Sequence, residues 1–308
     1  CRDLQTDNAN CGACGRTCTA GQVCSSGVCN TAATANTLNL ATQNVTVVGG
    51  AINPGADQDW FKITVAAGAK AWVLVDTGGP QNAGATSRDS QVTIFQSDGT
   101  TQVEFDDDDG TGTGADGTIE TGLASAIAGR TLTAAGDYLI KVNAFSATGI
   151  INPYKMYVVV TTAAAVAEVE GNDTAATANA IVTNAQTVGQ RSGSIGAGGD
   201  LDFYSVQATA GNVLFVSADT DPERDGTNTD LAVQVRDTNG TTVLLTIDSS
   251  IGGSNPANPE AESASFTVPV TGTYYVVARH FSATGTGTYN LLVAAANSDA
   301  VSNQVCPP

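Results

Sequence analysis

A long internal repeat is the feature of this sequence that most restricts its fold. The segment 50–61 matches the segment 193–204 without a gap, at an offset of 143 residues. Further matches follow in the same order at offsets of 141 and 136 residues, and the pentapeptide Phe-Ser-Ala-Thr-Gly occurs at both 145–149 and 281–285. Collinear matches with small drifts indicate one domain present twice, with loops of unequal length. Each copy is far longer than the roughly 20–50 residues of a solenoid unit, so we expect tandem domains.

Each copy has the alternating pattern of β-strands. Phe61, Ile63 and Val65 alternate with Lys62 and Thr64, and the second copy repeats the pattern from Tyr204 onward. A period of two places one side of a strand in a core and the other in water. The pattern continues in Val73 and Val75, and Gly-containing turn signals recur at short intervals, as in a sandwich or barrel. The sequence therefore predicts an all-β fold of two tandem antiparallel sandwiches.

The repeat and the composition set the expected boundaries. Residues 1–30 form a small disulfide-rich module, 31–162 the first sandwich, 163–167 an Ala-rich linker, 168–296 the second sandwich and 297–308 a polar tail.

Cysteines are concentrated at the N-terminus. Six of the seven lie in the first 29 residues, where too few apolar residues are present to build a core. A segment of this kind needs covalent cross-links to be stable, so we expect disulfides. The cysteine spacing does not favour one of the possible pairings over the others. Zinc and redox alternatives for the Cys11–Cys14 pair lack further histidines or a βαβ context. The predicted disulfide cysteines are Cys1, Cys11, Cys14, Cys18, Cys24, Cys29 and, with a partner left open, Cys306.

The charge balance restricts the partners. The chain has 30 acidic and 12 basic residues and a net charge of −18, which repels nucleic acid and anionic lipid. The same surplus of carboxylates suits calcium, which binds through oxygen ligands. No apolar run approaches the roughly 18 residues of a transmembrane segment, so we predict no membrane span.

The sequence lacks the residues of common catalytic sites. A Ser-His-Asp or Cys-His site needs a histidine base, and His280 is the single histidine, with no Gly-x-Ser-x-Gly elbow in the chain. Phosphate-binding Gly-x-x-x-x-Gly-Lys loops are absent as well. We therefore predict a protein that is not an enzyme, with His280 exposed at a strand end.

Four motifs of the second copy carry a family resemblance. They are Glu-Val-Glu-Gly-Asn-Asp at 168–173, Asp-Leu-Asp-Phe-Tyr at 200–204, Thr-Gly-Thr-Tyr-Tyr-Val at 271–276 and Gly-Thr-Tyr at 287–289. Together they resemble the bacterial pre-peptidase C-terminal (PPC) domain, which is related to the collagen-binding modules of collagenases. The first copy keeps two of these motifs and lacks the acidic lead, and the segment 1–30 is similar to short cysteine-rich units of secreted bacterial proteins. The resemblance implies jelly-roll-like sandwiches, a non-catalytic role and an extracellular or cell-surface location.

The resemblance also implies calcium bound through the acidic lead. If that lead folds back along the sandwich, its carboxylates meet those of the loop at 200–202, and a divalent ion offsets their repulsion. The predicted metal ligands are Glu168, Glu170, Asn172, Asp173, Asp200 and Asp202.

Three weaker cation candidates remain, each of which is equally a polar turn. They are the pair Asp57 and Asp59, the run 106–109 and the acids of 221–225. Among aromatic residues that a polymer would contact, Trp60 is expected on the outer face or under a loop. Phe145 and Phe281 are expected in the core, because both copies keep them.

Two classes of function agree with these features. One is a structural subunit of an extracellular filament, sheath or surface layer, with cysteines at both ends that allow head-to-tail self-association. The other is a module that binds an extracellular polymer or surface, or the non-catalytic tail of a larger secreted enzyme.

Overall fold

The computed structural model of the chain describes residues 31–40, 45–79, 81, 83–108, 123–182, 188–196, 198–248, 260–282 and 284–296, together with the backbone of 23–25 and 28–30. Within the first 30 residues, β1 (Val23–Ser25) and β2 (Val28–Asn30) form an antiparallel pair. The side chains of all seven cysteines fall outside the described residues, so the disulfides stay a prediction.

Two sheets form the first half of the chain, after a short 3-10 turn η1 (Ala32–Thr34). One sheet has the order β3-β5-β10-β7-β8, with β3 at Asn36–Thr37, β5 at Gln58–Val65, β10 at Gly136–Ala144, β7 at Ser90–Gln96 and β8 at Gln102–Asp107. The other has the order β4-β11-β6-β9, with β4 at Thr46–Ile52, β11 at Ile151–Thr161, β6 at Ala69–Asp76 and β9 at Ser125–Leu132.

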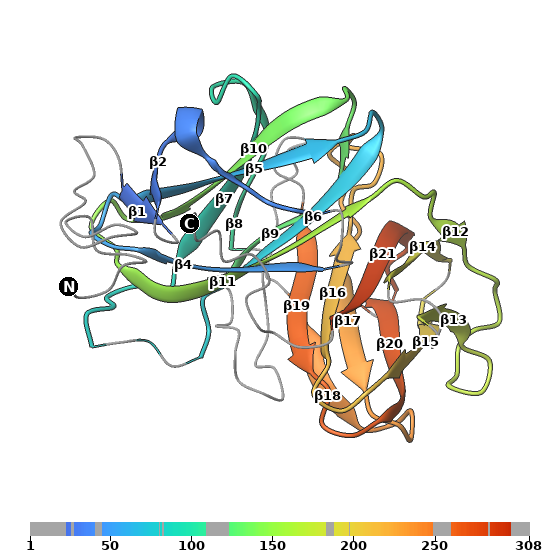
Figure 1. Cartoon of the computed structure of the whole chain (residues 1–308). Helices are drawn as coiled ribbons and strands as arrows, with labels where there is room; N and C mark the ends of the chain where they lie inside the picture. The colour runs from blue at the N-terminus through green and yellow to red at the C-terminus, as the bar shows by residue number, and fades with distance from the viewer. Residues whose placement is uncertain are drawn as a thin grey trace.

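The second half repeats this strand order. One sheet is β13-β15-β20-β17-β18, with β13 at Asn179–Val182, β15 at Asp202–Ala208, β20 at Gly272–His280, β17 at Leu231–Arg236 and β18 at Val243–Ile247. The other is β12-β14-β21-β16-β19, with β12 at Val166–Ala167, β14 at Val188–Ile195, β21 at Gly287–Ala296, β16 at Val213–Asp219 and β19 at Ala261–Thr267. The sheets are not purely antiparallel as predicted, because three short edge strands pair in parallel: the extra strand β12 with β14, β3 with β5, and β13 with β15. The all-β fold class is thus confirmed, and Figure 1 shows the two halves side by side.

The predicted alternation fills the core between the sheets. Phe61, Ile63 and Val65 of β5 point into the first core, as do Val73 and Val75 of β6. The second half has an equivalent core that includes Tyr204 and Val206 of β15.

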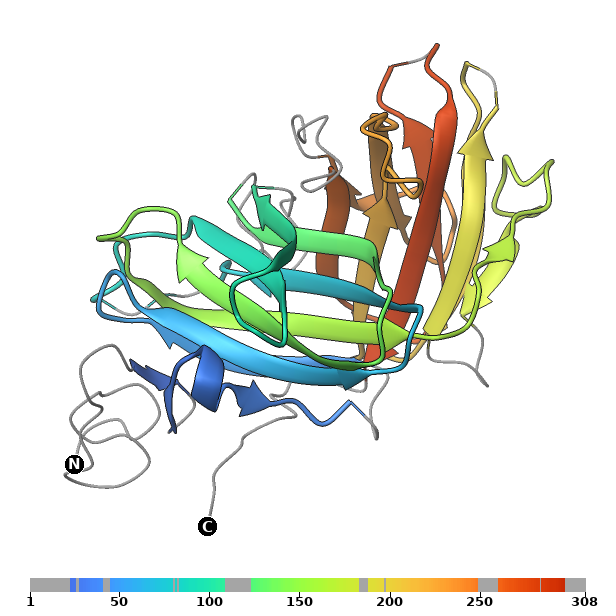
Figure 2. The same cartoon turned by 90° about the horizontal axis from the view of Figure 1, so that it is seen from above.

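The opposite face of β6 departs from the prediction. We expected it to face water, but Trp72 and Leu74 are fully buried and belong to the hydrophobic cluster of the second half. Tyr157 of β11 stacks on Phe215 of β16, with ring centroids 6.2 Å apart. The two halves therefore pack through the outer faces of one sheet from each, and Figure 2 shows the strands of the second half crossing those of the first steeply.

No helix in the described part of the chain is long and apolar enough to span a bilayer.

Candidate metal centre

The acidic lead of the second half is fixed along the sandwich by its backbone. The N–H of Glu168 donates to the carbonyl of Ser192 on β14 at 2.9 Å, and the N–H of Phe203 donates to the carbonyl of Asn172 at 2.9 Å. These bonds attach the lead to β14 of one sheet and to β15 of the other. The loop that precedes β15 lies between these attachments, so its carboxylates face those of the lead.

Three carboxylates converge at this place. Oxygens of Glu170, Asp200 and Asp202 all lie within 4.8 Å of one another. Asp202 is fully buried; its Oδ2 accepts a 2.6 Å hydrogen bond from Tyr289, and its Oδ1 has no hydrogen-bond partner among the described residues. A buried carboxylate oxygen without a donor is costly, and a cation bound by the three groups would remove that cost.

The carboxylates of the centre repel one another, and this repulsion adds to the effect of burial on their pKa values. Burial raises the pKa of Asp202 to about 8, and the negative charges of Glu168, Asp200 and Glu170 add to this shift, while the Tyr289 hydrogen bond opposes it. Slight desolvation and the charges of Glu168 and Asp200 raise the pKa of Glu170 too. No lysine or arginine is among the groups that shift these two carboxyls.

The remaining predicted ligands take other places. Glu168 accepts hydrogen bonds from the Ser194 N–H at 2.5 Å and from the Tyr204 hydroxyl at 2.8 Å. Asn172 is buried and its Nδ2 has no partner among the described residues, whereas Asp173 is exposed. The structure therefore brings three of the six predicted ligands together, with Glu168 bound to neighbouring groups.

A glycine allows the tyrosine to reach this centre. A Cβ on Gly193 of β14 would lie 2.4 Å from the ring and hydroxyl of Tyr289, so a side chain there would displace the group that donates to Asp202. Gly50 has the same relationship with Tyr154, whose hydroxyl donates to Asp59 at 2.6 Å. The two halves thus build the same Gly–Tyr–Asp arrangement.

The first half nevertheless lacks the acidic lead. The hexapeptide Thr-Ala-Ala-Thr-Ala-Asn at 31–36 recurs identically at 174–179, again at an offset of 143, which is a signal that the sequence analysis missed. In this register Ser25 and Gly27 stand in the places of Glu168 and Glu170. Asp57 is buried, its Oδ1 has no partner among the described residues, and burial together with the charge of Asp59 raises its pKa to about 8.

The acidic run 106–109 is only partly described. Asp106 is buried and its Oδ2 accepts from the Ala126 N–H at 2.5 Å. Asp107 and Asp108 lie with Asp89 in a group whose oxygens are within 4.8 Å of one another, whereas Asp109 lies outside the described residues. This group is partly exposed and forms a second, weaker candidate.

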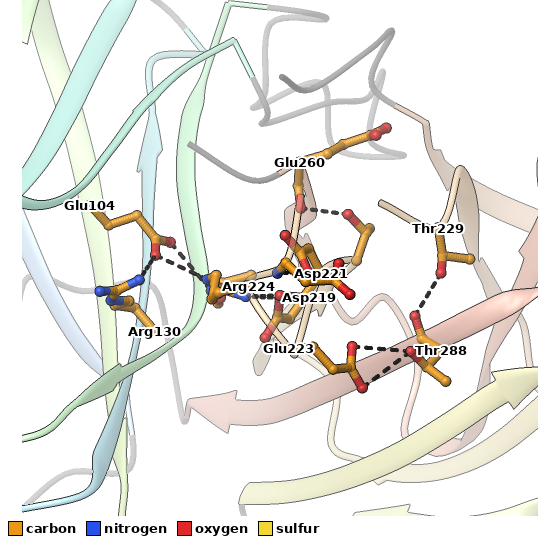
Figure 3. Close-up of polar contacts among 12 residues, drawn as sticks. Glu104, Arg130, Asp219, Asp221, Glu223, Arg224, Thr229, Glu260 and Thr288 are labelled. Atoms are coloured by element: carbon orange, nitrogen blue, oxygen red, sulfur yellow. Dashed lines mark hydrogen bonds and ion pairs between the residues drawn. The ribbon is translucent and has the colours of Figure 1, made fainter. Parts of the chain in front are cut away.

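The acidic loop 221–225 is a polar turn. The Asp221 carboxylate accepts from the N–H groups of Asp225 and Gly226 at 3.1 and 2.9 Å, so its oxygens are already satisfied by the loop itself. Sequence reasoning overlooked Arg224 in this loop. Its guanidinium reaches Asp219 at 2.5 Å and crosses to Glu104 of the first half at 3.2 Å (Figure 3).

His280 has no catalytic setting. It ends β20 and is partly exposed; its Nδ1 accepts from the Ser282 N–H at 3.1 Å and lies 3.2 Å from the Ser282 hydroxyl. Both contacts close a turn two residues long. Among the described residues no carboxylate hydrogen-bonds to the ring, which is the contact that orients a catalytic histidine.

The predicted positions of two aromatic residues were wrong. Phe145 and Phe281 are 61% and 56% exposed, because each follows a strand end and begins the loop that carries the repeated pentapeptide. Each is held by its backbone N–H, to the carbonyls of Asp89 and Asp230 respectively. Trp60 is nearly buried and packs on Phe95, with ring centroids 5.4 Å apart and Lys141 over both rings.

The sequence matches one family model. Residues 200–280 match the bacterial pre-peptidase C-terminal domain, which covers the carboxylates of the 200–202 loop and most of the second half. No curated protein matches the chain.

Similar solved structures align with parts of the chain. The periplasmic g-type lysozyme inhibitor PliG of Aeromonas hydrophila aligns at 16% identity over 38% of this chain and 96% of its own, with a TM-score of 0.28. PliG of Salmonella Typhimurium aligns at 19% identity over 39% of this chain and 99% of its own (TM-score 0.26). The pre-peptidase C-terminal domain of a Bacillus anthracis collagenase aligns at 14% identity over 41% of this chain and 94% of its own (TM-score 0.26).

Proposed function

We propose that this chain is a non-catalytic extracellular or periplasmic binding protein made of two copies of one jelly-roll-like sandwich, the second of which binds calcium. The family match at 200–280 and the repeated strand order support the duplicated sandwich. The convergence of Glu170, Asp200 and the fully buried Asp202 is the observation that carries the calcium site, and no described lysine or arginine is among the groups that shift the pKa values of Glu170 and Asp202.

Calcium would stabilise the second half through these carboxylates. Calcium takes six to eight oxygen ligands, and carboxylates supply one or two each. The Tyr289 hydroxyl lies 2.6 Å from Asp202 Oδ2 and 3.5 Å from Glu168 Oε2, so a small movement of the Glu168 side chain would bring a fourth carboxylate to the ion. The Asn172 side chain, buried and unsatisfied at Nδ2, supplies an amide oxygen on the same lead.

A double substitution tests this site. In Glu170→Ala/Asp200→Ala, the rise in melting temperature that calcium gives the wild-type protein should disappear, while the melting temperature in EDTA should change little. Asp98→Ala/Asp137→Ala removes two exposed acids of the first half and should keep the calcium response. An equal loss of stability in calcium and in EDTA would contradict the metal site.

The role as an assembly subunit is a separate proposal. It depends on the segment 1–30 and on Cys306, which lie outside the residues whose side chains the structure describes. A non-reducing gel beside a reducing gel tests whether Cys306 joins chains.

A further inference from the structure

A cavity of about 540 Å³ opens beside the candidate metal centre. Its floor is formed by β14 and β21, and its walls by the acidic lead on one side and the loop after β16 on the other. Successive residues of a strand point to opposite faces. Thr288 and Asn290 therefore face the cavity, while Tyr289 points into the core toward Asp202.

The walls of this cavity are acidic. Glu168 and Glu170 line one wall and Glu223 lines the other, and none of the described residues that line the cavity is a lysine or an arginine. These three carboxylates do not form a group with oxygens within 4.8 Å of one another, although such groups occur elsewhere in the described residues. The spacing therefore suits an extended organic cation better than a bare metal ion.

The floor supplies an unused polar group. Asn290 is 8% exposed, lines the cavity, and its side-chain amide makes no hydrogen bond to any other described residue. The amide group is thus available at the floor to a ligand or to water, which a polar group in a largely buried residue needs as a hydrogen-bond partner. Thr288, on the same strand as Asn290, positions the Glu223 side chain, because the Thr288 hydroxyl donates a hydrogen bond to the Glu223 carboxylate at 3.2 Å.

The neighbouring arginine does not neutralise Glu223. Arg224 follows it in the loop, but its guanidinium points the other way, to Glu104, Asp219 and the carbonyl of Ala128 (Figure 3). The guanidinium therefore binds to acidic side chains and a carbonyl at the interface between the halves, and not to Glu223. The negative charge of Glu223 is left facing the cavity.

We propose that this cavity binds a basic side chain, lysine or arginine, of a protein partner. The carboxylates on opposite walls receive the charged head, and the Asn290 carbonyl oxygen accepts one of its N–H donors. The volume lies within the roughly 300–1,000 Å³ of small-ligand sites, so the cavity also has room for the adjoining stem and backbone. This proposal rests on the proposed binding role, and it shares Glu168 and Glu170 with the calcium site. Glu223 and Asn290 belong to the cavity alone.

Amide NMR of the isotope-labelled full chain tests the proposal. N-acetyl-L-arginine amide and N-acetyl-L-lysine amide are the probes, and N-acetyl-L-norleucine amide is the neutral control of similar length. We expect saturable shifts of the Ser192 and Thr288 amides with the basic probes and none with norleucine. Equal shifts with norleucine would overturn the proposal.

Two variants and a matched control locate the effect. Glu223→Gln keeps the shape and the Thr288 contact and should weaken probe binding at least fivefold; Asn290→Ala should weaken it as well. Asp137→Asn removes an exposed charge of the first half and should leave binding unchanged. Equal weakening by Asp137→Asn would show a general charge effect and defeat the proposal. Unchanged binding in both Glu223→Gln and Asn290→Ala would show that the probes bind elsewhere, and would defeat it as well.

The outcome is separable from that of the calcium site. Probe binding in EDTA should persist in Asp200→Ala, since Asp200 does not line the cavity. Loss of the calcium response with retained probe binding would contradict the metal site alone. Retained calcium response with no probe binding would contradict the cavity alone.

Discussion

Arg224 and Glu104, 120 positions apart in the sequence, form an ion pair across the junction between the two halves, with Nε 3.2 Å from Oε2. The Glu104 side chain is 1% exposed and the Arg224 side chain 15%. Arg130 of the first half also reaches Glu104, at 3.3 Å, and Asp219 of the second half receives the other side of Arg224. Gly129 allows this contact, because a Cβ there would lie 2.4 Å from Asp219 Oδ2.

We expect Arg224→Met to be strongly destabilising. It removes the cation shared by two carboxylates that are almost completely buried. Glu104 keeps its contact with Arg130, but Asp219 loses its ion-pair partner, and breaking a buried ion pair costs about 3–5 kcal/mol. Denaturant unfolding monitors the change. The control is Arg279→Met, whose guanidinium donates to the carbonyls of His280 and Phe281 and which should cost less than about 1 kcal/mol.

A double-mutant cycle isolates the ion pair. Glu104→Gln in the Arg224→Met background removes one of the two carboxylate charges that Arg224 compensates, so the double variant should be more stable than the sum of the single effects predicts, by about 1–3 kcal/mol. Additive effects would indicate that the pair contributes nothing beyond its parts.

The pH dependence of stability should follow the buried carboxyls. Burial and the charge of Asp59 raise the pKa of Asp57 from 3.8 to about 8, so the folded state holds a proton that the unfolded state releases across this window. Stability in EDTA should therefore be greatest at the acidic end and fall as the pH rises toward 8. Asp57→Asn keeps the shape without the titration and should flatten the slope, although not completely, since the pKa of Asp202 is also raised to about 8. Asp137→Asn should leave the slope unchanged; a wild-type stability that rises over this range would contradict the assignment.

The sequence predicted local features well. Alternation in β5 and in its counterpart β15 determined which side chains enter the cores, and the offset of 143 correctly paired Asp57 with Asp200 and Asp59 with Asp202. These features are local, because strand periodicity and a repeated loop each depend on residues that are adjacent in the sequence.

Long-range packing was not predictable in the same way. The run from Ala71 to Val75 is continuously apolar, which is typical of a strand buried on both faces, but nothing in it states which partner covers the outer face. Arg224 lies in a loop that reads as an acidic turn, and its partner Glu104 is recognisable only once the two halves are docked. Retention of Phe145 and Phe281 in both copies does not by itself indicate the core, because a repeated surface loop also retains its residues.

The glycine of the metal centre should be sensitive to a single methyl group. In Gly193→Ala the Cβ would meet the Tyr289 ring and hydroxyl at 2.4 Å, so Tyr289 has to move away from Asp202. We expect a loss of about 1–3 kcal/mol from overpacking and a weaker calcium affinity in a calorimetric titration. Gly196→Ala adds a methyl group 3.6 Å from Asp200 Oδ2, an ordinary contact, and should have little effect on stability. Equal losses in the two variants would show that the Gly193–Tyr289 contact has no special role.

The junction between the halves should make their unfolding cooperative. Trp72 and Tyr157 of the first half lie in the same hydrophobic cluster as Phe215 of the second, so separating the halves exposes core residues of both. We expect a single calorimetric transition, lowered in Phe215→Ala, since truncating a buried phenylalanine costs about 3–5 kcal/mol. Phe281→Ala removes an exposed ring and should leave the free energy of unfolding within about 0.5 kcal/mol of the wild-type value. Two transitions in the wild-type protein, only one of them shifted by Phe215→Ala, would mean that each sandwich is stable without the contact of the other.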